Sequence, residues 1–209
     1  MEDAVTGNVR ELTWSRYVAL GDSLTAGQGD PGPDGRPIGW ARRLAKILTT
    51  RTAVSCGLVN LAVGGATVPM VLSEQLPAVP RLQPDLVSVT VGMNDIRVPE
   101  FSPKAFTAGM GRLLEGLAAT GATVLASTLP DIAEIVPLPR ALIEIAHQRI
   151  RQASDIIREQ AARLGVVCLD AWALPGSNDP GLFSDDRFHP NASGHTLLAT
   201  AFADLLVPG

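Results

Sequence analysis

Short runs of apolar, often β-branched residues alternate along the chain with longer stretches in which apolar residues recur at helical spacing. The short runs predict buried strands at 16–20, within 53–63, and at 86–91, 122–128 and 166–169. The longer stretches predict helices at 39–50, 103–120, 139–164 and 191–206. Ser102 and Pro103 suit the start of the second of these helices, and Gly121 suits its end.

This alternation predicts an α/β fold in which helices cover both faces of a parallel sheet of five strands. Ligands bind such open sheets beyond the carboxyl ends of the strands. Ser23 follows the first predicted strand, Gly64 and Gly65 follow the second, and Asn94 follows the third. Because these ends share one edge of the sheet, we expect a functional site there.

The composition adds limits on fold and partners. The 209 residues are 46% hydrophobic and 18% charged, which suits a single domain over 1–209 with 1–14 as a flexible N-terminal segment. The formal net charge of −4 and the absence of a Lys/Arg run argue against nucleic acid. Cys56 and Cys168 lie in apolar stretches, which argues against a disulfide scaffold or a cysteine-ligated zinc. Without a secretory signal or a run of roughly 20 apolar residues, we expect a cytoplasmic protein that does not insert into membranes.

Ser23 is a candidate nucleophile, within Gly-Asp-Ser-Leu at 21–24 directly after a strand. A serine hydroxyl needs a base to accept its proton and donors to stabilise the oxyanion. The Asn94 amide is a suitable donor at the end of the third strand. Both segments also suit simple turns, since Asp and Ser cap helices and Asn closes strands through Asx-turns.

Three histidines could supply the base. His147 and His195 fall within predicted helices and are interpreted as surface or structural residues. His189 lies just before the last helix, three residues after Asp186. A carboxylate at that spacing can accept the Nδ1 proton, which leaves Nε2 free to take the serine proton. The same residues suit a turn followed by an N-cap.

Four segments in order resemble the motifs of the SGNH (GDSL) hydrolase family: GDSL at 21–24, NLAVGGAT at 60–67, GMND at 92–95 and DRFHP at 186–190. Residues 29–44 further resemble its non-secreted, lipase-like esterase branch. The resemblance implies a three-layer α/β/α, flavodoxin-like fold and a Ser-His-Asp hydrolase of carboxylic esters that needs no metal or organic cofactor.

The resemblance also implies the site residues. Ser23 is the nucleophile, His189 the base and Asp186 its partner, with the family spacing favouring Asp186 over Asp185. The oxyanion donors are the Ser23 N–H, the Asn94 side chain and a glycine N–H. Counting from Asn60 places that glycine at Gly65, with Gly64 as the open alternative.

Other activities stay open. An acyltransferase, a lysophospholipase or a thioesterase would use the same triad. A metal-dependent phosphoesterase needs more metal ligands than three histidines offer, and no G-x-G-x-x-G or Walker pattern indicates a nucleotide-binding module. The irregular segments 27–38 and 132–139 are expected to wall the substrate pocket. Because no apolar lid is present, a short-chain acyl or acetyl ester is favoured over an emulsified lipid.

Overall fold

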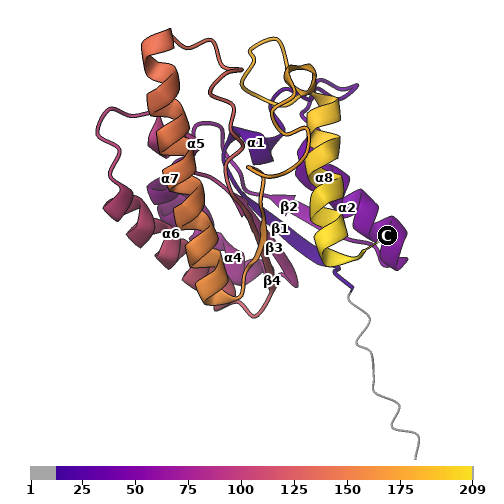
Figure 1. Ribbon diagram of the computed structural model, residues 1–209. Coiled ribbons are helices and arrows are strands. Elements are labelled where there is room, and N and C mark those ends of the chain that lie inside the picture. The colour runs from indigo at the N-terminus through magenta and orange to yellow at the C-terminus, as the bar shows by residue number, and fades with distance from the viewer. Residues whose placement is uncertain (1–12, 209) are drawn as a thin grey trace, which may run out of the picture.

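The computed structural model describes residues 13–208 and contains one sheet of five parallel strands (Figure 1). The strands are β1 (Arg16–Gly21), β2 (Gly57–Asn60), β3 (Leu86–Thr90), β4 (Thr123–Ser127) and β5 (Val167–Leu169). Their order in the sheet is β2-β1-β3-β4-β5. The register pairs Gly21 with Thr90, so the carboxyl ends of β1 and β3 lie side by side. The predicted parallel sheet is confirmed.

Four long helices cover the sheet: α2 (Gly39–Thr52), α6 (Pro103–Ala118), α7 (Arg140–Leu164) and α8 (Ala192–Leu206). Helices α6 and α7 pack on one face, where Leu113 and Ile157 are buried, and α2 and α8 pack on the other (Figure 1). On that second face the rings of Trp40 and Phe202 stack with centroids 4.7 Å apart. Because each helix buries one apolar stripe against the sheet, the chain forms the predicted three-layer α/β/α fold.

Several short helices were not predicted. Helices α1 (Ser23–Ala26) and α5 (Met93–Ile96) directly follow β1 and β3, and η3 (Pro180–Leu182) lies before α8. Between β2 and β3 come α3 (Val68–Met70), η1 (Val71–Gln75), η2 (Leu76–Ala78) and α4 (Val79–Leu82). Pro69, Pro77 and Pro80 interrupt this region. Since proline lacks the backbone N–H that an α-helix needs, the segment turns in short pieces without a long helical period.

The prediction that residues 1–14 form a flexible segment is wrong for residue 14. Trp14 is buried, and its indole N–H donates a hydrogen bond of 3.1 Å to Thr123 Oγ1 at the start of β4. Residues 1–12 lie outside the described part of the chain.

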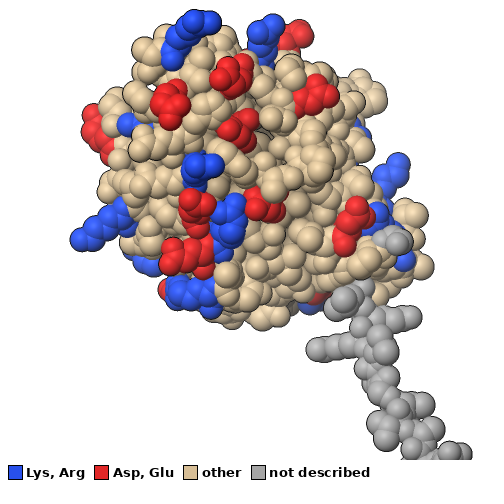
Figure 2. Space-filling view, viewed as in Figure 1, with Lys and Arg blue, Asp and Glu red and all other residues tan. Residues whose placement is uncertain are grey.

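Among the described helices, none is long and apolar enough to cross a membrane. On the face in Figure 2, acidic and basic side chains are interspersed without a continuous basic surface.

Candidate active site

Ser23 lies at the junction of β1 and α1. Asp22 caps α1 by accepting a 3.0 Å hydrogen bond from Leu24 N–H. Gly21 has a φ of +136°, and a Cβ there would lie 2.1 Å from Thr90 O, so only glycine fits. The buried Gln75 side chain holds the Gly21 backbone through two hydrogen bonds of 2.9 Å. This support fixes Ser23, which is 7% exposed, at the carboxyl edge of the sheet.

His189 and Asp186 complete a continuous hydrogen-bonded chain with Ser23. His189 Nε2 lies 2.9 Å from Ser23 Oγ, and His189 Nδ1 lies 2.6 Å from Asp186 Oδ2. Partial burial tends to raise the pKa of Asp186, but hydrogen bonds from the His189 ring and the His189 and Phe188 N–H groups hold it well below its usual range. An ionised Asp186 only accepts, so Nδ1 carries the proton and Nε2 accepts from the serine hydroxyl.

The His189 ring is also packed from the side. Phe188 contacts it edge-on, with centroids 4.8 Å apart, and the Arg97 guanidinium lies 4.8 Å above the Phe188 ring. Asp185, the neighbouring carboxylate, makes no hydrogen bond among the described residues. The structure therefore brings together Ser23, His189 and Asp186 and leaves Asp185 apart.

Three backbone N–H groups near Ser23 are available to an oxyanion. Within residues 13–208, the N–H groups of Ser23, Gly64 and Gly65 donate no hydrogen bond. Gly65 has a φ of +80°, and a Cβ built on Gly64 would lie 3.9 Å from the Ser23 Cβ. Both glycines remain candidates for the donor, because both belong to the exposed turn beside the serine.

The Asn94 amide already has two acceptors in the structure. Its Nδ2 lies 3.0 Å from Ala66 O and 3.4 Å from Asp22 Oδ2. The first hydrogen bond anchors the amide, while the second is long and weak. The N–H that faces Asp22 is therefore the one that could donate to an oxyanion with the smaller loss.

Asp22 was not identified from the sequence as part of the site. Burial raises its pKa to about 7, its bond from Leu24 N–H opposes the shift, and the nearby Asp95 charge adds to it. Both carboxylate oxygens of Asp95 accept from the single Val68 N–H, at 3.0 and 3.1 Å, which fixes the loop after β2. The sequence did hold a signal for Asp22, since it is an acidic residue directly before the candidate nucleophile at a strand end.

The other two histidines have separate surroundings. His195 is fully buried; its Nδ1 accepts from Trp40 N–H at 3.2 Å and its Nε2 lies 3.0 Å from Gln28 O. Burial lowers the pKa of His195, which keeps the ring neutral. His147 is partly exposed on α7, and its Nδ1 lies 2.7 Å from Oδ2 of Asp131 in the loop before that helix. Neither ring reaches Ser23, and no described group of His, Cys, Asp or Glu side chains has the arrangement of a metal site.

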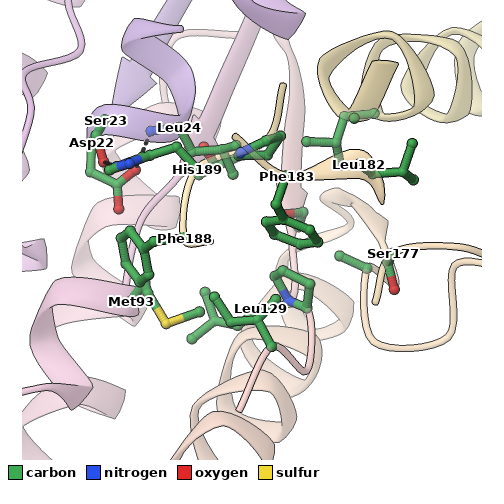
Figure 3. Close-up of a pocket in the computed structure, with 18 of the residues that line it drawn as sticks. Asp22, Ser23, Leu24, Met93, Leu129, Ser177, Leu182, Phe183, Phe188 and His189 are labelled. Atoms are coloured by element: carbon green, nitrogen blue, oxygen red, sulfur yellow. Dashed lines mark hydrogen bonds between the residues drawn. The ribbon is translucent and has the colours of Figure 1, made fainter. Parts of the chain in front are cut away.

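A pocket opens beside Ser23 and His189, above the carboxyl ends of the strands (Figure 3). Asp22, Ser23 and His189 gather at one side of it. The remaining wall is mostly apolar and comes from α5, the loops after β4 and β5, and α8. It includes Met93, Leu129, Ile132, Leu174, Leu182, Phe183, Phe188, Leu197 and Leu198.

The prediction that segments 27–38 and 132–139 wall the pocket is largely wrong. Segment 27–38 supplies no lining residue among those described, and 132–139 supplies only Ile132. Asp30 binds the Arg43 guanidinium at 2.8 Å and Gly39 N–H at 3.0 Å, which ties the first segment to α2. Gly29 instead lies against the backbone of Pro190. The segment therefore supports the histidine loop from outside the pocket.

Asn94→Ala is expected to lower kcat by about 10²–10³-fold and to change KM little, since the amide meets negative charge only in the transition state. Steady-state kinetics on a soluble ester would measure both constants. Asn191→Ala removes another partly buried amide side chain, one that caps α8, and serves as a stability control. A rise in KM with kcat unchanged would show that Asn94 binds ground-state substrate instead.

Comparison with known proteins places the chain in a family. Residues 19–197 match the model of the GDSL-like Lipase/Acylhydrolase family. The chain is 28% identical over 197 residues to the GDSL-like esterase Rv1075c of Mycobacterium tuberculosis, covering 91% of this chain but 61% of that protein.

Solved structures share the fold. The α/β hydrolase LAE5 from the metagenome of Lake Arreo, Spain, has a TM-score of 0.74 at 24% identity, covering 92% of this chain and 94% of that one. The acetylxylan esterase Axe2 of Geobacillus stearothermophilus has a TM-score of 0.75 at 18% identity, covering 94% and 96%. With the family match spanning Ser23 and His189, the chain belongs to the GDSL-like lipase/acylhydrolase family.

Proposed function

We propose that this protein hydrolyses carboxylic esters through an acyl-enzyme on Ser23. The observation that carries the proposal is the unbroken hydrogen-bonded chain from Ser23 Oγ through His189 to Asp186. In the first step Ser23 Oγ bonds to the ester carbonyl carbon while its proton passes to His189 Nε2. The tetrahedral intermediate then collapses, and the alcohol leaves with that proton.

In the second half of the reaction, a water molecule takes the place of the alcohol and the same steps run in reverse. It gives a proton to His189 Nε2 as its oxygen bonds to the acyl carbon, and the returning proton releases Ser23 with the carboxylic acid. Asp186 holds the ring and stabilises the imidazolium in both steps. The oxyanion of each intermediate is held by the Ser23 N–H, the Asn94 amide and a glycine N–H, for which Gly65 is proposed.

Short-chain acyl esters are the proposed substrate class. The sequence favours them because the irregular loops lack an apolar lid for an oil–water interface. Among the proteins that share the fold is one described as an acetylxylan esterase. Transfer of the acyl group to a second alcohol would use the same intermediate, and product analysis with added alcohols would show it.

Covalent labelling tests the chemistry directly. A fluorophosphonate should add once per chain, and peptide mapping should place the adduct on Ser23, because only a serine activated by a neighbouring base reacts readily. Labelling should block release of p-nitrophenol from p-nitrophenyl butyrate, and a chelator should leave that release unchanged. An adduct elsewhere, or full activity after labelling, would contradict the proposal.

A further inference from the structure

We infer that the apolar pocket beside Ser23 selects the acyl group, accepting a chain longer than acetyl, while the alcohol remains in solvent. The inference rests on the proposed function and adds the substrate class within it. It concerns the wall of the pocket that lies away from Ser23, where Figure 3 shows Leu182 and Phe183 on the opposite side from Ser23 and Asp22.

The first support is the exposure of the wall. Leu174, Leu182, Phe183, Leu197 and Leu198 are each only partly buried, although all five line the same hollow. Leaving apolar surface in contact with water costs about 25 cal/mol per Å². A concave, mostly apolar wall beside a reactive group is the usual form of a site that an apolar ligand fills.

The second support is where the polar groups lie. Away from Ser23, His189 and Asn94, hydroxyl groups such as Ser127 and Ser177 are the main polar side chains of the wall. The Ser127 hydroxyl already donates to Thr128 O at 3.0 Å. A sugar or a charged alcohol would lose its hydration in this pocket and find few partners, whereas an acyl chain loses nothing comparable. The pocket therefore suits the acyl side of an ester.

The third support is the open surface across the serine. Val63, Gly64 and Gly65 are exposed, and a Cβ built on Gly65 would meet no atom within 4 Å. The alcohol of an ester bound with its chain in the pocket would lie toward this open side. Few side chains there could discriminate among alcohols, so acyl selectivity should be strict and alcohol selectivity loose.

A series of p-nitrophenyl esters from acetate to dodecanoate tests the inference on the wild type. Each methylene buried in the pocket can raise kcat/KM by up to about fourfold. We therefore expect hexanoate to exceed acetate by about tenfold or more. Hexanoate esters of methanol, glycerol and glucose should differ among themselves by less than about tenfold. A maximum at acetate, or a stronger dependence on the alcohol than on the chain, would overturn the inference.

Two substitutions at Leu182 test the wall itself. Leu182→Trp narrows the pocket and should lower kcat/KM for hexanoate at least tenfold while acetate changes less than about threefold. Leu182→Ala widens the pocket and should move the optimum to longer chains. Leu205→Trp, on the exposed outer side of α8, is the matched control and should leave the profile unchanged. Equal losses for every ester in both Leu182 variants would contradict the assigned wall.

A binding measurement separates this inference from the proposed function. Calorimetry with the Ser23→Ala variant should show tighter binding of hexanoate than of acetate, a result that needs no catalysis. If the proposed ester hydrolysis were wrong, the wild type would turn over no ester, yet this difference in binding would persist. Equal or absent binding of the two acids would overturn the pocket assignment alone.

Discussion

Replacing Ser23 by alanine should reduce ester hydrolysis by about 10⁴–10⁶-fold and leave the fold intact. The substitution removes the atom that forms the acyl-enzyme, and the remaining rate comes from binding and the oxyanion donors alone. Within the described residues the Ser23 hydroxyl hydrogen-bonds only to His189, and the helix cap is made by Asp22, so the local backbone keeps its support. Release of p-nitrophenol under saturating substrate would measure the loss.

Ser55→Ala is the matched control for this variant, because Ser55 is exposed in the loop before β2, at the edge of the sheet opposite the pocket. It should retain activity close to that of the wild type. Circular dichroism and thermal unfolding of both variants would verify that they fold. A folded Ser23→Ala protein with near wild-type turnover would show that another group is the nucleophile.

Replacing His189 by alanine should also lower kcat by several decades, because Ser23 then has no acceptor for its proton. The loss should be about as large as that of Ser23→Ala, and the double variant should be little worse than either single one. Such non-additivity is expected of residues that act as one unit. Steady-state kinetics on all three proteins would test it.

The remaining histidines serve as controls for that experiment. His147→Ala should keep full activity, because its ring pairs with Asp131 away from Ser23. His195→Ala should lower the melting temperature, since it leaves the buried backbone N–H of Trp40 without its acceptor and removes the hydrogen bond to Gln28 O. The folded fraction should nevertheless turn over substrate. A loss in kcat for His195→Ala equal to that for His189→Ala would refute the choice of base.

The sheet was predictable because its signal is local. The run at 86–91 is apolar apart from Ser88 and Thr90, and β3 is buried at every position, as a strand covered on both faces by helices requires. The long helices were equally predictable, since Trp40, Leu44 and Leu48 in α2 recur at the spacing that places them on one buried face. The short turns of α3 to α4 were missed because their prolines erase that period.

The candidate triad was also indicated by short-range patterns. Asp186 lies three residues before His189, and one turn of chain suffices for their 2.6 Å contact. Ser23 joined them through family resemblance and its place at a strand end, although 166 residues separate it from His189. No local pattern encodes that distance, which the parallel sheet and the loop before α8 determine together.

By itself, the sequence determined the strands, the long helices, the order of the motifs and the pairing of Asp186 with His189, because each depends on neighbours within one or two turns. Only the tertiary structure decided the pocket. Its wall combines α5, two loops and α8, and the nearby segment 27–38 is drawn away from it by Asp30 and Arg43. The shape of the pocket depends on which residues, far apart in the sequence, line it together, and only long-range packing determines that.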